Sequence, residues 1–375
     1  MDFDFLLSGI TAITPQQVIM YLIGILLIFL AIKKDLEPSL LLPMGFGAIL
    51  VNIPNTGALS TNDAQGIIQW LFEVGIEASE AMPLLLFIGI GAMIDFGPLL
   101  SNPKMFLFGA AAQFGIFGAI TAATLMGFDL KDAASIGIIG AADGPTAIYV
   151  SQLLNSKYIG AISVVAYSYM ALVPIVQPTV IKLLTTKKER RIHMKTNATE
   201  VPHYVRIIFP IAVTFIAGLV APASVSLVGF LMFGNLLREC GVLNTLSDTA
   251  QNVLVNLITL LLGISIAFNM QAENFINLET LGIMAIGLIA FVFDTAAGVI
   301  FAKILNLFSK EKINPMIGAA GISAFPMASR VVQKLALKED PTNILIMQAT
   351  GTNVSGQIAS VVAGGVILNL VSAIL

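Results

Sequence analysis

The chain has 375 residues, of which 57% are hydrophobic and 11% are charged, and its formal net charge is −3. A soluble globular domain carries about 25% charged residues, so this composition excludes a water-soluble protein. The small net charge gives no indication of a nucleic-acid partner, and the single Cys240 excludes a disulfide framework. The sequence therefore predicts an integral protein of the lipid bilayer.

The N-terminal segment MDFDFLLSGITAITPQQ lacks a basic region and a small-residue cleavage site, so we expect no cleaved signal peptide. Apolar runs of roughly 17–25 residues follow, as helices need to cross a hydrocarbon core about 30 Å thick. We expect an all-α polytopic membrane protein with about 10–12 helical segments. The predicted spans lie near residues 18–32, 39–54, 81–100, 104–126, 133–154, 157–184, 205–221, 223–239, 250–270, 279–303, 313–335 and 343–372.

A polar stretch rich in Lys and Arg interrupts this series. It predicts a cytoplasmic basic linker over residues 185–204, because short basic loops stay on the cytoplasmic side of a membrane. The linker separates an N-terminal transmembrane repeat (1–184) from a C-terminal transmembrane repeat (205–375). The sequence leaves open whether the linker is a solvated hinge or a docking surface for a soluble partner.

The two halves resemble each other weakly. LEPSLLLPMGFGAIL (36–50) is echoed by VAPASVSLVGFLMFGNLL (220–237), and GAADGPTAIY (140–149) by GAAGISAFPM (318–327). Five predicted spans separate the two GAA segments, and an odd number gives them opposite orientations in the membrane. We therefore expect two inverted repeats, each with a broken helix or re-entrant hairpin, as in secondary transporters with an ion site at the repeat interface.

Asp143 lies within a predicted span and is followed at once by Gly144 and Pro145. An intramembrane aspartate costs ~2.5–3.5 kcal/mol on insertion scales and needs compensation. Pro145 suits the first turn of a new helix with Asp143 as its N-cap, and the unwound carbonyls of residues 140–142 would then be free ligands. This pattern favours a site for a hard monovalent cation, although the helix dipole or a proton could also satisfy Asp143.

The second interrupted segment covers residues 313–340, where Asn314 precedes a proline and Ser323 offers another neutral oxygen. Ser323 and Arg330 are seven residues apart, which puts them on one helical face about 10.5 Å apart. Arg330 is therefore nearer the aqueous end. It could extend into water there, or hold a carboxylate with its bidentate fork.

Further polar groups lie inside predicted spans. Tyr169 is either a hydrogen-bonded packing group or a proton donor, and Asp294 is a second intramembrane acid that could join the same polar cavity. The last span contains the polar run 350–360, which either bonds neighbouring helices or lines the ion site. Its polar residues include Thr352, Asn353, Ser355 and Gln357.

Motifs for a phosphate-binding loop, a zinc protease or a paired-cysteine centre are absent from the sequence, so energy for pumping must come from a gradient or another subunit. In contrast, the sequence contains five longer motifs in this order: MGFGAILVNIP, ADGPTAIY, VPIVQP, NPMIGAAGISAFPMASRV and GTNVSGQIASVVAGG. With these motifs the chain resembles the β subunit of the biotin-dependent, sodium-translocating decarboxylases that act on oxaloacetate, methylmalonyl-CoA or glutaconyl-CoA. The resemblance runs from about residue 16 to the C-terminus.

The resemblance implies an enzyme of the translocase class in the bacterial cytoplasmic (inner) membrane. Such a subunit decarboxylates carboxybiotin, exports Na⁺ and consumes a proton. The implied partners are a biotin carrier subunit, a carboxyltransferase (α) subunit and a small membrane-anchor subunit, and the implied assembly is a homo-oligomer such as a trimer. Biotin would not be attached to this chain, because the Ala-Met-Lys-Met motif is absent and the nearest string is His193-Met194-Lys195.

The matched motifs also imply roles for individual residues. Asp143, Tyr169 and Arg330 would be catalytic, with Asp143 as the principal Na⁺ and coupling residue and Tyr169 as the proton route. Arg330 and Ser323 would face carboxybiotin. The implied Na⁺ site comprises Asp143, Asn314, Gly318, Ser323 and Asn353. The alternative is a Na⁺-coupled secondary carrier of organic anions, which would need no partner subunit.

Overall fold

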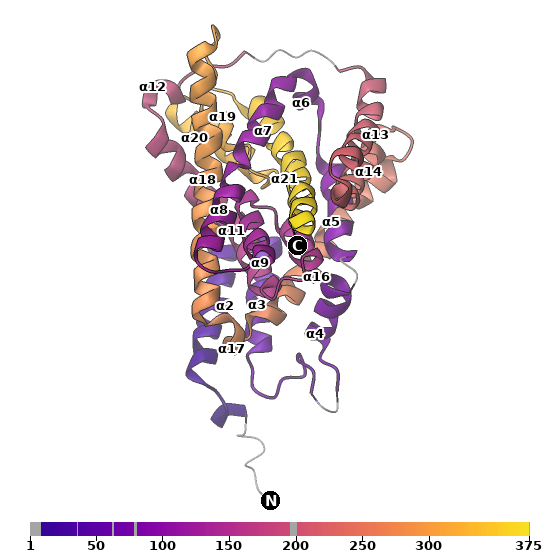
Figure 1. Cartoon of the computed structure of the whole chain (residues 1–375), viewed down its shortest axis with the longest axis vertical. Helices are drawn as coiled ribbons and strands as arrows, with labels where there is room; N and C mark the ends of the chain where they lie inside the picture. The colour runs from indigo at the N-terminus through magenta and orange to yellow at the C-terminus, as the bar shows by residue number, and fades with distance from the viewer. Residues whose placement is uncertain (1–8, 36, 62–63, 79–80, 196–200, 375) are drawn as a thin grey trace, which may run out of the picture.

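The computed structural model describes residues 9–35, 37–61, 64–78, 81–195 and 201–374, and no strand occurs in this part of the chain, which confirms the predicted all-α class (Figure 1). The helices of the first half are α2 (Pro15–Lys34), α3 (Pro38–Val51), α4 (Ile67–Phe72), α5 (Ala81–Met93), α6 (Gly97–Ser101), α7 (Phe106–Ala112), α8 (Phe114–Leu125), α9 (Leu130–Gly137), α10 (Gly144–Leu153) and α11 (Ile159–Leu184). Those that follow are α12 (Lys187–Arg190), α13 (His203–Val220), α14 (Val225–Glu239), α15 (Asn244–Asp248), α16 (Val255–Ile266), α17 (Ala272–Phe275), α18 (Leu278–Phe308), α19 (Met316–Ala319), α20 (Met327–Glu339) and α21 (Ile346–Ile374). Short 3-10 or π turns join some of them: η1 (Glu73–Glu77), η2 (Pro103–Met105), η3 (Ile138–Ala141), η4 (Pro222–Ser224), η5 (Thr249–Leu254) and η6 (Ala267–Met270).

Seven helical stretches in the described part of the chain are long and apolar enough to cross a membrane. They are Pro15–Lys34, Pro103–Leu125, Ile159–Leu184, His203–Val220, Asn244–Met270, Leu278–Phe308 and Ile346–Ile374. Twelve apolar runs were predicted, and the difference has a structural cause. Helices α3 and α14 have only 14 and 15 residues, while the runs at 81–100, 133–154 and 313–335 are interrupted by non-helical residues.

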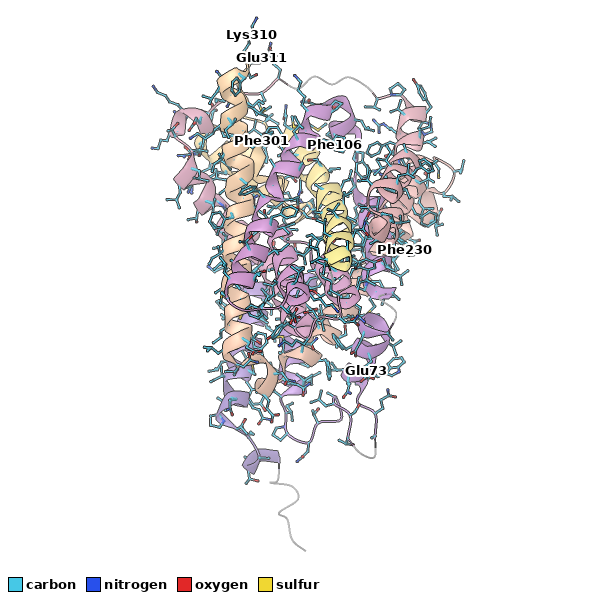
Figure 2. The ribbon with its side chains drawn as sticks, viewed as in Figure 1. Glu73, Phe106, Phe230, Phe301, Lys310 and Glu311 are labelled. Carbon is cyan, nitrogen blue, oxygen red and sulfur yellow. The ribbon has the colours of Figure 1, made fainter. Side chains whose placement is uncertain are left out.

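The surface of the molecule fits a bilayer. Large apolar side chains are exposed along its sides, among them Phe215, Leu219 and Phe293, with 57–70% of each exposed. Figure 2 shows Lys310 and Glu311 beyond one end of α18 and Glu73 near the opposite end of the molecule. The basic helix α12 lies at the Lys310 end (Figure 1).

The first interrupted segment consists of α9, η3 and α10. Ala142 adopts a left-handed conformation with φ of 53° and ends η3. Asp143 is the N-cap of α10, where its side chain accepts the backbone N–H of Thr146, and a proline lies in the first turn. The predicted helix start at Asp143 is therefore confirmed.

The second interrupted segment joins α19 to α20 through residues 320–326, which form turns rather than helix. The backbone N–H of Ser323 donates to the carbonyl oxygen of Ala141 at 3.0 Å. Helix α18 supports this segment closely, because a Cβ added at Gly318 would lie 2.0 Å from the oxygen of Gly298. Small residues permit such backbone contacts between membrane helices, and here they bring the two interruptions together.

Candidate functional site

The carboxylate of Asp143 is buried, with 3% of the residue exposed, and polar side chains surround it. Its Oδ2 atom lies 2.8–3.0 Å from four donors on α10, on the second interrupted segment and on α21: Thr146 Oγ1, Ser323 Oγ, Gln357 Nε2 and Ser360 Oγ. Its Oδ1 atom accepts the backbone N–H of Thr146 at 3.3 Å. The site is thus assembled from three separate parts of the chain.

Four donors lie around one carboxylate oxygen, and this is more hydrogen bonds than the lone pairs of one oxygen can accept with good geometry. A carboxylate has about four lone-pair sites over its two oxygens, and a hydroxyl has a single hydrogen to donate. The Ser360 hydroxyl has three acceptors within reach, namely Asp143 Oδ2 at 2.8 Å, Ser323 Oγ at 2.9 Å and Gln357 O at 3.0 Å. Some hydroxyl oxygens can therefore turn their lone pairs, rather than their hydrogens, toward the centre of the cluster.

Asn353 contributes a second feature. It is fully buried, and its Nδ2 donates to the carbonyl oxygen of Ile322 at 2.7 Å. Its Oδ1 has no hydrogen-bond partner among the described residues, although burying an unpaired polar atom costs about 1–3 kcal/mol. A neutral oxygen is therefore available next to the turn that carries Ser323.

The donor set has the chemistry of a monovalent cation site. Carboxylate, hydroxyl and amide oxygens suit hard cations, and a buried cation requires charge compensation. The cluster has one carboxylate, Asp143, and in the described part of the chain no group of three or more His, Cys, Asp or Glu residues could hold a metal ion. One negative charge balances one positive charge, so Na⁺ fits this set better than a divalent ion.

Two residues predicted for the cation site are not among the hydrogen-bond partners of Asp143. Asn314 donates from Nδ2 to the carbonyl oxygens of Arg190 and Ile192, both at 2.9 Å, and its Oδ1 accepts the N–H of Met316 at 3.1 Å. Gly318 is packed against the backbone of α18. The structure therefore places Asn314 and Gly318 where they hold the second interrupted segment.

Neither the predicted proton route nor the predicted carboxylate-binding residue is among the hydrogen-bond partners of Asp143. The Tyr169 hydroxyl, on α11, donates to the carbonyl oxygen of Met284 on α18. Arg330 is exposed in the first turn of α20. Burial raises the pKa of the nearby Glu37 carboxyl, and the positive charge of Arg330 acts in the opposite direction. Arg330 thus lies within electrostatic reach of Glu37, a partly buried acid.

Thr146 and Ser360 contact Asp143 but were not singled out from the sequence. Thr146 follows the N-cap Asp143 by three residues, and Ser360 follows Gln357 by three on the same helix. Residues three apart on a helix are neighbours on its surface. This spacing from Asp143 and Gln357 is the signal that could have identified both hydroxyls.

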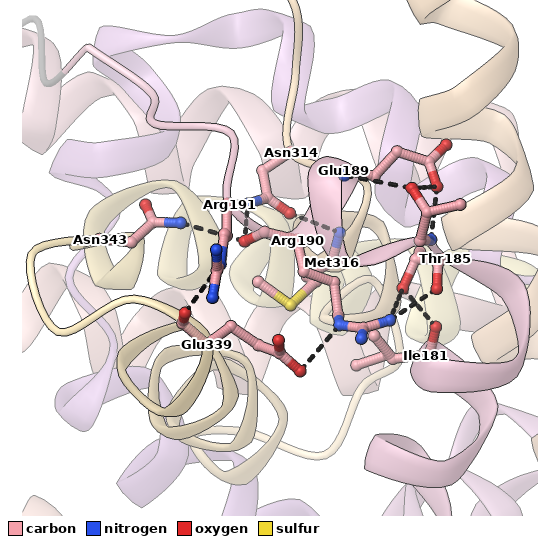
Figure 3. A network of polar contacts seen from close by, with 10 residues as sticks. Ile181, Thr185, Glu189, Arg190, Arg191, Asn314, Met316, Glu339 and Asn343 are labelled. Carbon is pink, nitrogen blue, oxygen red and sulfur yellow. Dashed lines mark hydrogen bonds and ion pairs between the residues drawn. The ribbon is translucent and has the colours of Figure 1, made fainter.

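The basic linker is anchored to the second half of the chain (Figure 3). Arg190 is 6% exposed and donates from Nε to Glu339 at 3.0 Å, while Arg191 donates to the Glu339 carbonyl oxygen at 3.0 Å. Asn343 donates to the carbonyl oxygens of Arg190 and Ile192, the same two that Asn314 binds. Part of the linker is therefore a fixed element that holds the Asn314 end of the second interrupted segment.

Comparison with known proteins identifies relatives over nearly the whole chain. Residues 16–371 match the family described as the Na⁺-transporting oxaloacetate decarboxylase beta subunit. The chain is 48% identical to the methylmalonyl-CoA decarboxylase subunit beta of Veillonella parvula, covering 97% of this chain and 96% of the relative. It is 48% identical to the glutaconyl-CoA decarboxylase subunit beta of Acidaminococcus fermentans, with the same coverage. For the probable oxaloacetate decarboxylase beta chain of Vibrio cholerae, identity is 44% and coverage 95% of each chain.

Proposed function

The chain belongs to the beta-subunit family of the Na⁺-transporting decarboxylases, and on this premise we propose that it is the membrane subunit of a Na⁺-pumping decarboxylase. It is a multi-pass bacterial membrane protein. We propose that it decarboxylates carboxybiotin delivered on a separate carrier subunit, and that this reaction drives Na⁺ export with consumption of a proton.

The observation that carries this function is the buried oxygen cluster around Asp143. Na⁺ is the transported substrate, and its ligands would be the Asp143 carboxylate, the hydroxyl oxygens of Ser323 and Ser360, and Oδ1 of Asn353. The support is the crowding of donors on Asp143 Oδ2 and the unpaired oxygen of Asn353. Asn314 and Gly318 complete the site by holding the second interrupted segment rather than by direct coordination.

The decarboxylation step belongs to a different region. The N–C bond of carboxybiotin breaks, CO₂ leaves, and the ureido nitrogen takes up one proton. Arg330, with Ser323 further inside, would hold the carboxylate of carboxybiotin through its guanidinium fork. Tyr169 would provide the proton route. Because neither Arg330 nor Tyr169 is hydrogen-bonded to Asp143, whereas Ser323 is, we propose that a conformational change couples the two events. Moving one Na⁺ against 100 mV costs about 2.3 kcal/mol.

We further propose that residues 1–184 and 205–375 are inverted repeats joined by the linker 185–204. The support is reciprocal packing between the halves. A Cβ added at Gly91 of α5 would lie 1.8 Å from the Leu231 oxygen of α14, and one at Gly47 of α3 would lie 2.6 Å from Ala267 Cβ just after α16. Helices of each half thus pack closely on the other half, and rocking between such repeats gives alternating access.

The partner subunits of the complex are proposed from family membership. We propose that the biotin carrier and the carboxyltransferase (α) subunit approach the cytoplasmic end. Lys187 and Lys188 stay exposed there, while Arg190 is buried. A small membrane-anchor subunit and further copies of this chain, with a trimer as the working assembly, would occupy lipid-facing helices.

Decarboxylation of free carboxybiotin by membranes that hold the full complex tests the function. We expect activity that requires Na⁺ and that Asp143→Asn abolishes. Na⁺-dependent uptake of an organic anion without decarboxylation would identify the secondary carrier instead, which family membership does not favour.

A further inference from the structure

A second buried acid, Asp294, lies next to the first interrupted segment. It is on α18, is fully buried, and is not hydrogen-bonded to Asp143. Its Oδ1 accepts the backbone N–H of Gly115, and the N–H of Ile116 is a second backbone donor to this carboxylate. Gly115 and Ile116 are in the first turn of α8, after the break at Gln113. Asp294 therefore caps the N-terminus of α8 from another helix.

The other oxygen of this carboxylate faces η3. A Cβ added at Gly140 would lie 2.8 Å from Asp294 Oδ2 and 2.9 Å from the Cβ of Ala290. Gly140 precedes Ala141, whose carbonyl oxygen accepts the backbone N–H of Ser323. The carboxylate of Asp294 is thus wedged between the start of α8 and the backbone that leads to Asp143.

Helix capping alone does not account for an acid at this point. Oδ2 of Asp294 has no hydrogen-bond partner among the described residues, and a buried carboxylate oxygen without a donor is unfavourable. Oδ2 lies directly beside Gly140, because a Cβ added there would be only 2.8 Å from this oxygen. The geometry of Asp294 is that of a rigid spacer between two helix breaks.

We propose that Asp294 is a positioning residue for the Na⁺ site. By capping α8 with Oδ1 and contacting Gly140 with Oδ2, it fixes η3 so that Ala141 and Asp143 stay in register with Ser323. This role rests on the Na⁺ function proposed for Asp143. Residues that orient metal ligands from outside the ligand set typically change metal affinity by 10–100-fold when mutated, so about tenfold weaker Na⁺ binding is expected on its loss.

Three variants of the full chain, in its native complex, test this role. Asp294→Ala removes both contacts. Asp294→Asn keeps an oxygen for the Gly115 N–H and retains the volume, so it should have the smaller effect. Asn52→Ala is the matched control. Asn52 is also buried and bonds to the backbone at another helix break, donating to the Met270 oxygen and accepting the Ala272 N–H, both at 2.8 Å.

The measurement is the thermal midpoint of this chain in detergent-solubilised membranes, followed by immunoblot, as Na⁺ replaces K⁺ at constant ionic strength. A ligand at free concentration c that binds only the folded state stabilises it by RT ln(1 + c/Kd), so the dependence of the midpoint on Na⁺ concentration gives the Na⁺ half-saturation of the folded protein. We expect Asp294→Ala and Asn52→Ala both to lower the midpoint without Na⁺. Only the Asp294 variants should raise the Na⁺ half-saturation fitted from this dependence, and Na⁺-dependent decarboxylation should shift in parallel.

A wild-type half-saturation in Asp294→Asn and Asp294→Ala would overturn the positioning role, as would an equal shift in Asn52→Ala. If Asp294→Ala does not accumulate, Asp294→Asn and Gly140→Ala decide the outcome, because the added Cβ of Gly140→Ala clashes with the same oxygen. The proposed function would fail on a different result. In that case either wild-type protein would show no stabilisation by Na⁺, or Asp143→Asn would retain that stabilisation.

Discussion

Asp143 and Ser323 are 180 residues apart in the sequence, and the Ser323 hydroxyl donates to Asp143 Oδ2 at 2.9 Å. Each residue lies where a helix is interrupted, one in each half of the chain. A site shared in this way changes whenever the two halves move relative to each other. On the proposed function, this relationship would allow a cation bound at Asp143 to be transported rather than merely held.

Ser360→Ala should weaken Na⁺ binding without unfolding the chain. A hydrogen bond to a charged group is worth about 1.5–3 kcal/mol, or roughly a 10- to 150-fold change in an equilibrium constant. The Na⁺ concentration for half-maximal decarboxylation measures the effect. Ser265→Ala is the control, because Ser265 is also buried and its hydroxyl donates to Leu262 O on α16. Equal shifts in the two variants would show that Ser360 acts only through packing.

Arg330→Gln should impair carboxybiotin decarboxylation and leave Na⁺ binding intact. Arginine holds carboxylates with a rigid bidentate fork, and Arg330 is exposed on α20 apart from the Asp143 cluster. We expect a higher carboxybiotin concentration for half-maximal rate and an unchanged Na⁺-dependent thermal shift. Lys334→Gln removes the same charge from an exposed position one turn later. Loss of the Na⁺ shift in Arg330→Gln would contradict the separation of the two regions.

Tyr169→Phe should reduce the maximal rate while Na⁺ still binds. Positioned acid–base groups contribute about 10²–10⁴-fold to rate, and this change removes the hydroxyl that donates to Met284 O. Rates at saturating Na⁺ and carboxybiotin, in H₂O and D₂O, measure the effect. Tyr21→Phe is the control, since its hydroxyl also donates to a backbone oxygen, that of Asn52, at 2.7 Å. Comparable rates in the two variants would remove Tyr169 from the proton route.

Asn314→Ala and Asn343→Ala should destabilise the linker anchor in a coupled way. Both amides donate to the carbonyl oxygens of Arg190 and Ile192. In each single variant the other amide still serves these oxygens, so a single loss should cost about 1 kcal/mol and the double loss more than the sum. Thermal midpoints of the two single variants and the double variant measure the coupling.

The variants Asn314→Ala and Asn343→Ala also test whether Asn314 coordinates Na⁺ directly. If Asn314 only anchors the segment, Asn314→Ala and Asn343→Ala should change the Na⁺ half-saturation to the same extent, because both amides hold the same two carbonyl oxygens. A shift in Asn314→Ala that is absent from Asn343→Ala would restore Asn314 to the ligand set.

Local features of the site could be predicted from the sequence, and tertiary ones could not. The Asp-Gly-Pro string predicts an N-cap and a broken helix because capping depends on adjacent residues. The contacts of Gln357 and Ser360 with Asp143 depend on how α21 is rotated against α10. The family resemblance implies that Asn314 is a Na⁺ ligand, and nothing in the sequence indicates that folding places the linker carbonyl oxygens beside its amide. Seven unbroken spans are found in the described residues where twelve apolar runs were predicted, since a run such as 81–100 can contain a backbone break that its hydropathy does not reveal.

Decarboxylation-driven Na⁺ uptake into inverted membrane vesicles that hold the full complex tests the central claim most directly. Asp143→Asn keeps the shape of the side chain and removes its charge, while Asp248→Asn changes an exposed acid in the same way. We predict that Asp143→Asn abolishes uptake and that Asp248→Asn retains it. Uptake at the wild-type rate in Asp143→Asn would contradict a Na⁺ path through this carboxylate.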